Sequence, residues 1–561
     1  MTRRWESVAP LLVGALLALP TALAYYPPMT DLPSHEAVVG ILRHWGDAAY
    51  FPPGLYELNL GQTNQLFHLL AWFFSLAFGT RWGVKLTIIF AQLAIFHAGA
   101  RFADYTGRSR WGVLLIAPLA LGFTYYWGFV ANLLGYAGFL YALPLFDRAA
   151  QAPTGRRTVT GCVAFVLLYL AHGSVFTMAL PVAAGLSFVH RLTARRRALA
   201  LLPVAFGTLL MAAAWWRLSQ LFTAGQPTNK TFFFPLREKV RTFAESFVGL
   251  DEATSQTLLV ALAGIAAATL VLWRIEVNAQ VKQDAKQDAE PADPAIVKAP
   301  DLPRWRRALI RYRFELLAAT LIVGYLASPY NFRGAMFIHH RFLGPAWALL
   351  VLAAAPVALA CGRRSLRSVI AKVLCAAFPI ALVVAAIPQF RDSDRSHRDL
   401  DAVMDHLPSQ AAVTFLSMDR GGASEGRAFD PSSGVARSVA QRGGRTGPTF
   451  TGSPICPIQI RRELRWDDYS YRLMSAGSRA LVPAHDLDRF GWVLVRTRTA
   501  DIAKILTRAF LPDAELVFSQ GEWLLFRSTH TLAGLESAEP PLPAGAETIM
   551  ARVLRRPATP R

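Results

Sequence analysis

An acidic motif near the start of the chain contains residue types that can transfer protons or bind cations. Asp31 and His35 lie four residues apart, so on a helix they share a face, with Glu36 beside them. A carboxylate in this position can act as a general base that His35 and Glu36 adjust, or it can hold a divalent cation. The pattern also favours a helix N-terminus, with Asp31 as the capping residue and Pro33 in the first turn. Residue types alone leave both interpretations open.

A second polar motif, in segment 328–342, contains four basic or imidazole side chains: Arg333, His339, His340 and Arg341. The two arginines are candidates for binding the phosphate of a lipid carrier, because guanidinium groups donate bidentate hydrogen bonds to phosphate. Contact with membrane headgroups explains them equally well. A metal site at the two histidines is the weaker interpretation, because no third ligand is near them, and the residues that would bind a metal stay unknown. Arg43, on the helix expected after the acidic motif, is a further candidate for substrate binding.

The composition indicates what must position these residues. Of 561 residues, 53% are apolar and only 17% are charged, and the mean hydropathy is +0.30. These values exclude a disordered chain and a single soluble domain, and they indicate a polytopic helical membrane protein. The net charge of +20 fits membrane topology and anionic lipids rather than nucleic acid. The four cysteines fit neither a metal-binding spacing nor a disulfide framework.

Twelve apolar blocks are candidates for membrane helices. They are 8–24, 64–80, 84–100, 111–124, 128–146, 158–171, 174–190, 199–216, 256–274, 314–328, 342–361 and 368–388. Basic clusters between the blocks are consistent with the positive-inside rule if block 64–80 lies on the outer surface. This assignment predicts about eleven spans, a cytoplasmic N-terminus and an extracytoplasmic C-terminus. The first block is either a signal anchor or a cleaved signal peptide.

The sequence predicts two domains. Residues 1–390 form the membrane domain, which includes a first outer loop at 27–82 with surface helices and a flexible cytoplasmic linker at 275–312. Residues 391–561 are polar and predict a small extracytoplasmic α/β domain. Its expected elements are helices at 397–408 and 500–510, strands at 411–417 and 492–496, a hairpin at 515–519 and 522–526, and a long loop at 419–455.

This organisation resembles the GT-C superfamily of integral-membrane glycosyltransferases. They use polyprenyl-phosphate sugars and include aminoarabinose transferases and protein O-mannosyltransferases. The run Phe67–Gly79 resembles the surface helix of the family with its Phe-Gly ending, and His340–Pro345 is similar to its Arg-Tyr-Leu-x-Pro run. Asp31 stands in the place of the catalytic acid of the family. The usual Asp-Glu pair is replaced here, and Asn132 is the nearest polar residue where a second acid is expected.

The resemblance implies a sugar transfer from a lipid-phosphate donor to a glycan, lipid or protein acceptor at the outer face of a bacterial inner membrane. Asp31 would deprotonate the acceptor hydroxyl or hold a divalent cation, and Arg333 or Arg341 would stabilise the leaving phosphate. Two alternatives stay open, a non-catalytic scaffold for envelope assembly and a transporter of lipid-linked glycans. The near absence of ionisable residues in the spans counts against transport.

Overall fold

The chain forms two compact units. The computed structural model describes residues 2–190, 192–222, 231–285, 303–332, 335–354, 366–417, 431–446, 449–461, 481–482, 486–510, 512–530 and 548–549. The first unit comprises residues 1–22 and 88–387, and the second comprises residues 23–87 and 388–561. Three helices, α2, α5 and α19, continue from one unit into the other.

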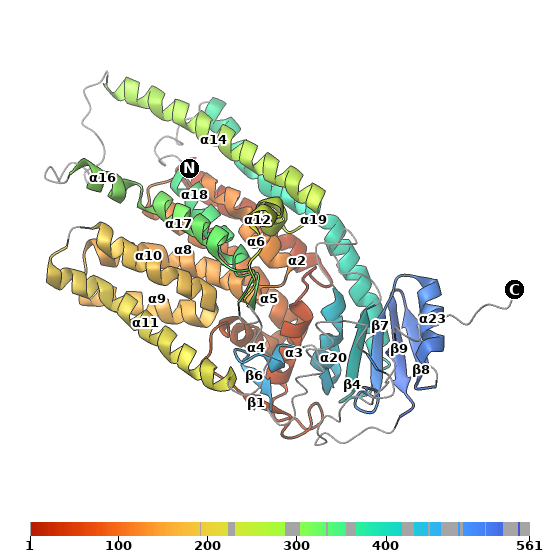
Figure 1. Ribbon diagram of the computed structural model, residues 1–561. Helices are drawn as coiled ribbons and strands as arrows, with labels where there is room; N and C mark the ends of the chain where they lie inside the picture. Colours follow the sequence, from red (N-terminus) through yellow and green to blue (C-terminus); the bar gives the residue numbers. More distant parts are fainter. Residues whose placement is uncertain are drawn as a thin grey trace. The chain divides into compact units, whose positions relative to one another are not determined.

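The first unit is almost entirely helical (Figure 1). Its helices are α1 (Thr2–Ala15), η1 (Leu16–Ala18), α2 (Leu19–Leu23), α5 (Thr80–Tyr105), η2 (Arg110–Ile116), α6 (Ala117–Ala120), α7 (Phe123–Tyr126), α8 (Val130–Gln151), α9 (Gly155–Ala171), α10 (Gly173–Val189), α11 (Ala194–Phe222), α12 (Leu236–Arg241), α13 (Phe243–Val248), α14 (Glu252–Ala285), α16 (Arg304–Arg311), α17 (Arg313–Ala327), α18 (His340–Ala354) and α19 (Leu366–Met404). The short strands β2 (Asn331–Phe332) and β3 (Ala335–Met336) form an antiparallel pair before α18.

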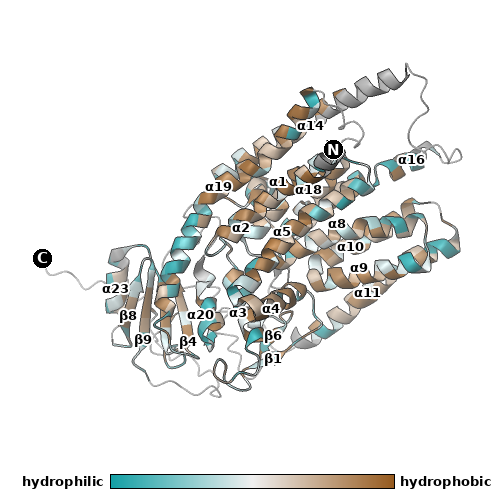
Figure 2. Cartoon of the chain, turned by 180° about the vertical axis from the view of Figure 1, so that it is seen from behind, coloured by the Kyte–Doolittle hydropathy of each residue, from teal (hydrophilic) through white to brown (hydrophobic). Residues whose placement is uncertain are grey.

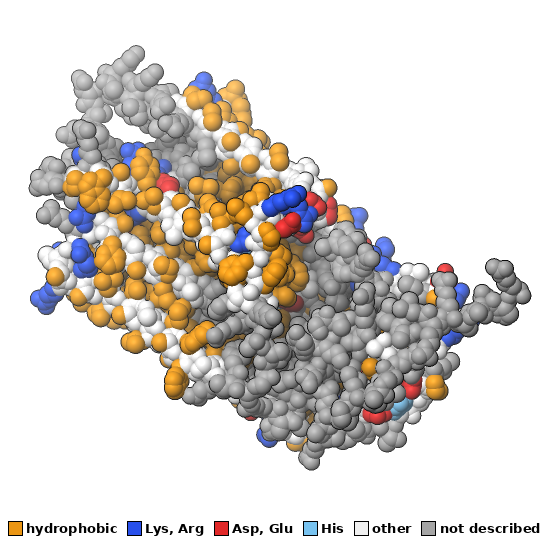
Figure 3. All heavy atoms as spheres, in the orientation of Figure 1, with side chains coloured by type: hydrophobic (Ala, Val, Ile, Leu, Met, Phe, Trp, Pro, Cys, Tyr) orange, Lys and Arg blue, Asp and Glu red, His pale blue; other side chains and the backbone are white. Residues whose placement is uncertain are grey.

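Four described helices are long and apolar enough to cross a membrane, namely α5, α8, α19 and the Ala194–Ser219 part of α11. Shorter apolar helices lie at Val8–Leu23, Leu66–Phe78, Gly173–Val189 and His340–Ala353. Figure 2 shows apolar residues along much of α5 and α11, whereas the last part of α19 is hydrophilic. On the face that Figure 3 shows, apolar side chains cover much of the helical unit, and Lys and Arg gather at the end where α16 lies. The chain is therefore an integral membrane protein, and the number of eleven spans stays a prediction.

Two sequence-based expectations for the first unit differ from the structure. The block 111–124 is not one continuous span, because it is divided among η2, α6 and α7. Gly122 lies at the last of these breaks, and a Cβ there would be 2.3 Å from the carbonyl oxygen of Pro118. The predicted linker 275–312 is helical at both ends, in α14 up to residue 285 and in α16 from residue 304. Residues 286–302 lie outside the described residues.

The second unit combines the start of the chain with its C-terminal part. Its further elements are α3 (Leu32–Arg43), β1 (Tyr56–Leu58), α4 (Leu66–Phe78), β4 (Ala412–Ser417), η5 (Pro431–Val435), α20 (Ala436–Arg442), β5 (Arg445–Thr446), η6 (Phe450–Gly452), β6 (Ile458–Ile460), β7 (Trp492–Arg496), α23 (Ala500–Phe510), β8 (Ala514–Gln520) and β9 (Trp523–Ser528). Five strands form one sheet in the order β5-β4-β7-β9-β8. Strands β5, β4 and β7 are parallel, whereas β9 is antiparallel to both β7 and β8.

Residues 27–82, which the sequence predicts to be the first outer loop, are part of this second unit. Strand β1 pairs antiparallel with β6, so that Tyr56 lies opposite Ile460. A shared hydrophobic core contains side chains from α3, α20 and the strands β1 and β6, among them Val38, Ile41 and Val439. This division differs from the sequence-based one, which assigned 27–82 to the membrane domain. The apolar face of α3 is buried against C-terminal residues, and no short-range pattern in the sequence indicates that pairing.

Candidate active site

Asp31 occupies the position just before helix α3. Its backbone carbonyl accepts hydrogen bonds from the amides of Ser34 at 3.1 Å and His35 at 3.2 Å, as the residue before a helix does. Its half-buried side chain, however, makes no capping hydrogen bond. The helix-cap interpretation therefore explains the backbone of Asp31 and not its carboxylate.

His35 forms a buried pair with His68 of α4. Nδ1 of His35 lies 2.9 Å from Nε2 of His68, and the His35 ring also contacts Phe67 and Phe450, with ring centroids 5.4 and 4.7 Å away. Burial lowers the pKa of His68 to about 4, so this partner is neutral near pH 7. The pair fixes the direction of both rings and links α3 to α4.

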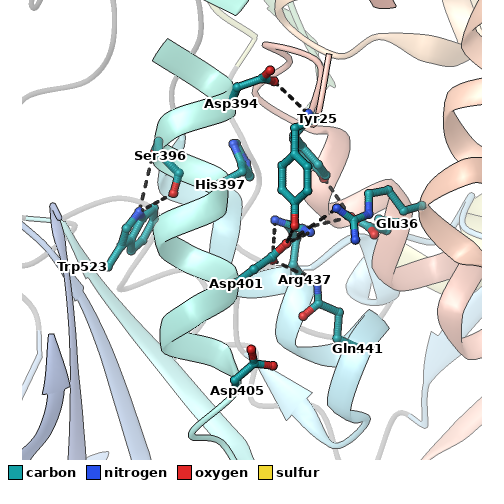
Figure 4. A network of polar contacts seen from close by, with 12 residues as sticks. Tyr25, Glu36, Asp394, Ser396, His397, Asp401, Asp405, Arg437, Gln441 and Trp523 are labelled. Atoms are coloured by element: carbon teal, nitrogen blue, oxygen red, sulfur yellow. Dashed lines mark hydrogen bonds and ion pairs between the residues drawn. The ribbon is translucent and has the colours of Figure 1, made fainter. Parts of the chain in front are cut away.

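Glu36 lies in a buried polar network, shown from close by in Figure 4. Its Oε2 accepts hydrogen bonds from the hydroxyl of Tyr26 at 2.9 Å and from Nε of Arg437 at 3.2 Å. The side chain of Arg437 is completely buried, and that of Glu36 is 3% exposed. Nη1 of Arg437 also lies 2.8 Å from Oδ1 of Asp401 on α19. The carboxylate of Glu36 is thus held by two donors inside the protein, which is the arrangement that a buried charge requires.

The electrostatics of this network favour a charged Arg437. Burial alone would lower the pKa of Arg437, but the carboxylates of Glu36 and Asp401 outweigh burial and raise it. Burial, reinforced by the charge of Glu36, raises the pKa of Tyr26 well above its usual value, so the hydroxyl stays protonated and donates a hydrogen bond to Glu36. The guanidinium of Arg437 lies 4.3 Å from the centre of the Tyr26 ring, and His397 stacks on the same ring at 4.0 Å. Ion pairs and a contact with the Tyr26 ring therefore hold the guanidinium of Arg437 in place.

Arg43 lies in the last turn of α3 and is exposed. Its Nη1 is 3.4 Å from the place of a Cβ added to Gly79, the residue that ends α4 with a φ of +80°. The Phe-Gly ending on which the family resemblance rests therefore lies beside Arg43. Asp31 and Arg43 stand at opposite ends of the 12-residue helix, about 18 Å apart along its axis.

A second polar cluster surrounds Arg341 in the helical unit. Nη1 of Arg341 lies 3.2 Å from Nε2 of His172, whose Nδ1 lies 2.9 Å from the hydroxyl of Ser174. The hydroxyl of Tyr136 donates to the carbonyl oxygen of Arg341 at 3.4 Å, and Asn132 donates to the Tyr136 hydroxyl at 3.5 Å. Because a guanidinium can only donate, Nε2 of His172 must accept, and the imidazole is neutral in this contact. The cluster thus combines one cation with neutral polar groups.

His339 and His340 pack among aromatic rings. His339 is fully buried and meets His340 edge to face, with ring centroids 4.1 Å apart. Nε2 of His340 lies 3.3 Å from the hydroxyl of Ser246, and its ring lies 4.3 Å from that of Phe123. Among the residues that the structure describes, no three His, Cys, Asp or Glu side chains converge as metal ligands. A divalent cation at Asp31 stays a prediction. Arg333 lies outside the described residues.

The sequence analysis predicted some of the residues in these two clusters and missed others. Asp31, His35, Glu36 and Arg43 lie on or beside one helix of the second unit, and His339, His340 and Arg341 lie together in the first. The partners His68, His172 and Arg437 were missed. His172 gave a usable signal, since it is an ionisable residue in a turn between two apolar blocks. Arg437 gave none, because it lies in a Gly-, Ser- and Arg-rich stretch that predicts a loop.

Two solved structures match nearly the whole chain, and they show that it shares their fold. Both are crystal structures of ArnT from Cupriavidus metallidurans. The structure bound to undecaprenyl phosphate matches with a TM-score of 0.53 and 13% identity, over 94% of this chain and 98% of ArnT. The apo structure matches over the same shares, with a TM-score of 0.53 and 12% identity. The resemblance that the sequence suggested is thus confirmed at the level of the fold.

Other comparisons add little. The cryo-EM structure of the arabinofuranosyltransferase AftD from Mycobacteria matches 95% of this chain and 42% of AftD, with 16% identity and a TM-score of 0.44, and we draw no argument from it. No family model matches the chain, and no curated protein sequence matches it. The identities are too low to transfer any activity, so the comparisons establish the fold alone.

Proposed function

We propose that this protein is a glycosyltransferase that moves a sugar from a polyprenyl-phosphate donor to an acceptor at the outer face of the membrane. The observation that carries the proposal is the fold shared with ArnT, a protein that has been solved with undecaprenyl phosphate bound. The acidic motif supports it, because Asp31 stands where the family resemblance expects the catalytic acid and its side chain does not cap α3.

In this reaction the carboxylate of Asp31 accepts the proton of the acceptor hydroxyl, which then attacks the anomeric carbon of the donor sugar. The bond from that carbon to the phosphate oxygen breaks, and the lipid phosphate leaves with the bonding electron pair. Arg341, in the first unit, is our candidate for binding the lipid phosphate, since a guanidinium is a cation whose planar donors suit phosphate. Its Nη1 lies 3.2 Å from Nε2 of neutral His172, and its Nη2 donates to the carbonyl oxygen of Met336 at 3.2 Å. His35 supports α3 through His68, and Glu36 does so through Arg437.

The test replaces Asp31 by Asn in the purified full chain. The probes are undecaprenyl phosphates carrying mannose or aminoarabinose, the two sugars that the family resemblance suggests, and the measurement is release of undecaprenyl phosphate in the presence of bacterial envelope extract. Asp31→Asn should lower kcat by about 10²–10⁴-fold, the usual contribution of a general base, and leave the melting temperature unchanged. Retained turnover in this variant would exclude Asp31 as the base.

Asp47→Asn is the matched control. Asp47 also lies in segment 27–82, its side chain is exposed, and it accepts a hydrogen bond from the amide of Ala49 at 2.9 Å. The control should keep full turnover. A loss in both variants would point to a general effect of charge in this segment.

The transporter alternative predicts buried carboxylates along a pathway, and Asp147 is the described carboxylate that best fits that description. Its side chain is completely buried near the end of α8. It accepts hydrogen bonds from Nη2 of Arg313 at 2.8 Å and from the hydroxyl of Tyr105 at 2.7 Å, and Nε2 of His190 lies 3.0 Å away. These partners come from α5, α17 and the residue after α10. The group therefore joins helix ends, and it does not favour transport over sugar transfer.

A further inference from the structure

The C-terminal segment 431–442, which comprises η5 and α20, contacts the acidic motif at three successive points within the second unit. The hydroxyl of Ser433 donates to the carbonyl oxygen of Thr30, the residue before Asp31. Arg437 pairs with Glu36 in the second turn of α3. Ala440 lies against Gly40 so closely that a Cβ on Gly40 would be 2.8 Å from the Cα of Ala440. The segment therefore runs along α3 from its start almost to its end.

Arg437 is the contact in this series that carries charge, and its surroundings fix its position. Its guanidinium bridges Glu36 and Asp401, with Nε 3.2 Å from the first carboxylate and Nη1 2.8 Å from the second. Gln441, one turn later on α20, donates to Asp401 at 3.1 Å, and the Tyr25 hydroxyl donates to the same carboxylate. Figure 4 shows Glu36, Arg437 and Asp401 pointing toward one another from three different elements. A displacement of α3 would separate buried opposite charges, which is costly.

The direction of α3 determines where the carboxylate of Asp31 lies. Asp31 is five residues before Glu36, and its backbone carbonyl is already hydrogen-bonded into the first turn of the helix. The helix therefore transmits any shift at Glu36 to Asp31. In proton transfer a base must come within about 3 Å of the hydroxyl that it deprotonates, and a misplacement of about 1 Å can cost 10²-fold in rate.

We propose that Arg437 is a positioning residue for sugar transfer, which fixes α3 through Glu36 and so holds Asp31 in its reactive position. The proposal rests on the function proposed above, and it makes the C-terminal part of the chain a component of the active machinery. Arg437 touches neither donor nor acceptor in this role. It acts on the rate of the chemical step and leaves donor binding unchanged.

The experiment compares Arg437→Lys, Arg437→Met and Glu36→Gln with the native full chain. Arg437→Lys keeps the charge but loses the fork that bridges two carboxylates. The measurements are kcat and KM for the undecaprenyl-phosphate sugar, the melting temperature, and hydrogen exchange of the backbone amides of 29–36. Arg437→Lys should lower kcat by about 10–100-fold, with KM for the donor within twofold of the native value. Exchange at 29–36 should speed up about tenfold or more.

Arg442→Met is the matched control on the same helix. The Arg442 guanidinium pairs with exposed Asp405, on the C-terminal turn that follows α19. This variant should leave kcat and the exchange of 29–36 unchanged. If Arg437→Met does not fold, the two milder variants decide the question.

The possible outcomes separate this proposal from the one on which it rests. A lower melting temperature with native kcat in Arg437→Lys and Glu36→Gln would reduce Arg437 to a stabilising residue and overturn the positioning role. Unchanged exchange at 29–36 in both variants would overturn it as well, whatever the activity. A native protein that transfers no sugar while Arg437→Lys still loosens 29–36 would refute the proposed function and leave the mechanical link intact.

Discussion

Replacement of Gly40 by Ala tests how tightly the C-terminal segment is packed on α3. The added Cβ would lie 2.8 Å from the Cα of Ala440 and 3.3 Å from its Cβ and carbonyl oxygen. The nearest atom is backbone, so no side chain can rotate away, and α20 must move by roughly 0.6 Å to restore an ordinary contact of about 3.4 Å. Overpacking of this kind costs about 1–3 kcal/mol, and the replacement of a helical glycine returns about 0.5–1 kcal/mol.

The net loss should therefore be about 0–2.5 kcal/mol. For a unit of roughly this size, 1 kcal/mol corresponds to about 2–4 °C, so we expect the melting temperature to fall by up to about 10 °C. The assay is thermal unfolding of the detergent-solubilised full chain, followed by the fluorescence of a thiol-independent dye. Gly264→Ala on α14 is the control, because nothing lies within 4 Å of a Cβ at that position. The control should be neutral or slightly stabilising. A Gly40→Ala protein that melts above the native temperature would refute the tight packing.

Two further predictions concern charged groups in the two units. Arg341→Gln should weaken binding of undecaprenyl phosphate about tenfold or more and leave binding of uncharged undecaprenol unchanged. Native mass spectrometry measures both affinities. Arg241→Gln is the control, since Arg241 is exposed and pairs with Glu238. Equal loss in both variants would contradict a specific phosphate contact. Burial opposes a charged His530, but hydrogen bonds with Asp488 and Asp513 outweigh it and raise the pKa of His530. The protonated histidine therefore stabilises the folded state. This stabilisation is fully present below about pH 6.5 and is lost as pH rises through the higher folded-state pKa. A melting temperature that does not decline in that range, or declines equally in His530→Gln, would contradict it.

Much of the local structure was predictable because it follows from short-range patterns. The apolar run at 492–496 forms the central strand β7, the periodic run at 500–510 forms α23, and the alternating segments on either side of Gly521 form the β8–β9 hairpin. The helix expected at 64–80 is α4, which ends at Gly79 with a φ of +80° that glycine adopts easily. In each case the residues that decide the structure lie within a few positions of one another.

The candidate site could be predicted only in part, because its contacts span most of the chain. Glu36 and Arg437 are 401 residues apart in the sequence, and strands β1 and β6, which pair with each other, are separated by a similar number of residues. Composition even indicated the wrong structure at this point, since the predicted loop 419–455 contains η5 and α20. The buried face of α20 has the small residues Ala436 and Ala440 on both sides of Arg437, and small residues are typical of loops as well as of close helix packing.

The carboxylates of Asp31 and Glu36, both near the start of α3, differ in their surroundings and therefore in the roles that we propose for them. Glu36 is buried, accepts hydrogen bonds from Tyr26 and Arg437, and has no room to accept a proton from a substrate without the loss of that ion pair. Asp31 is half-buried, and the helix uses its backbone rather than its side chain. A general base must be reachable by the acceptor and must change its protonation state during turnover, and the half-buried Asp31 fits these requirements better than the buried Glu36. The sequence analysis names Asp31 as the candidate base and Glu36 as a residue that adjusts it. The buried ion pair of Glu36 with Arg437 supports this division, because it holds α3 in place and leaves Asp31 as the candidate for proton transfer.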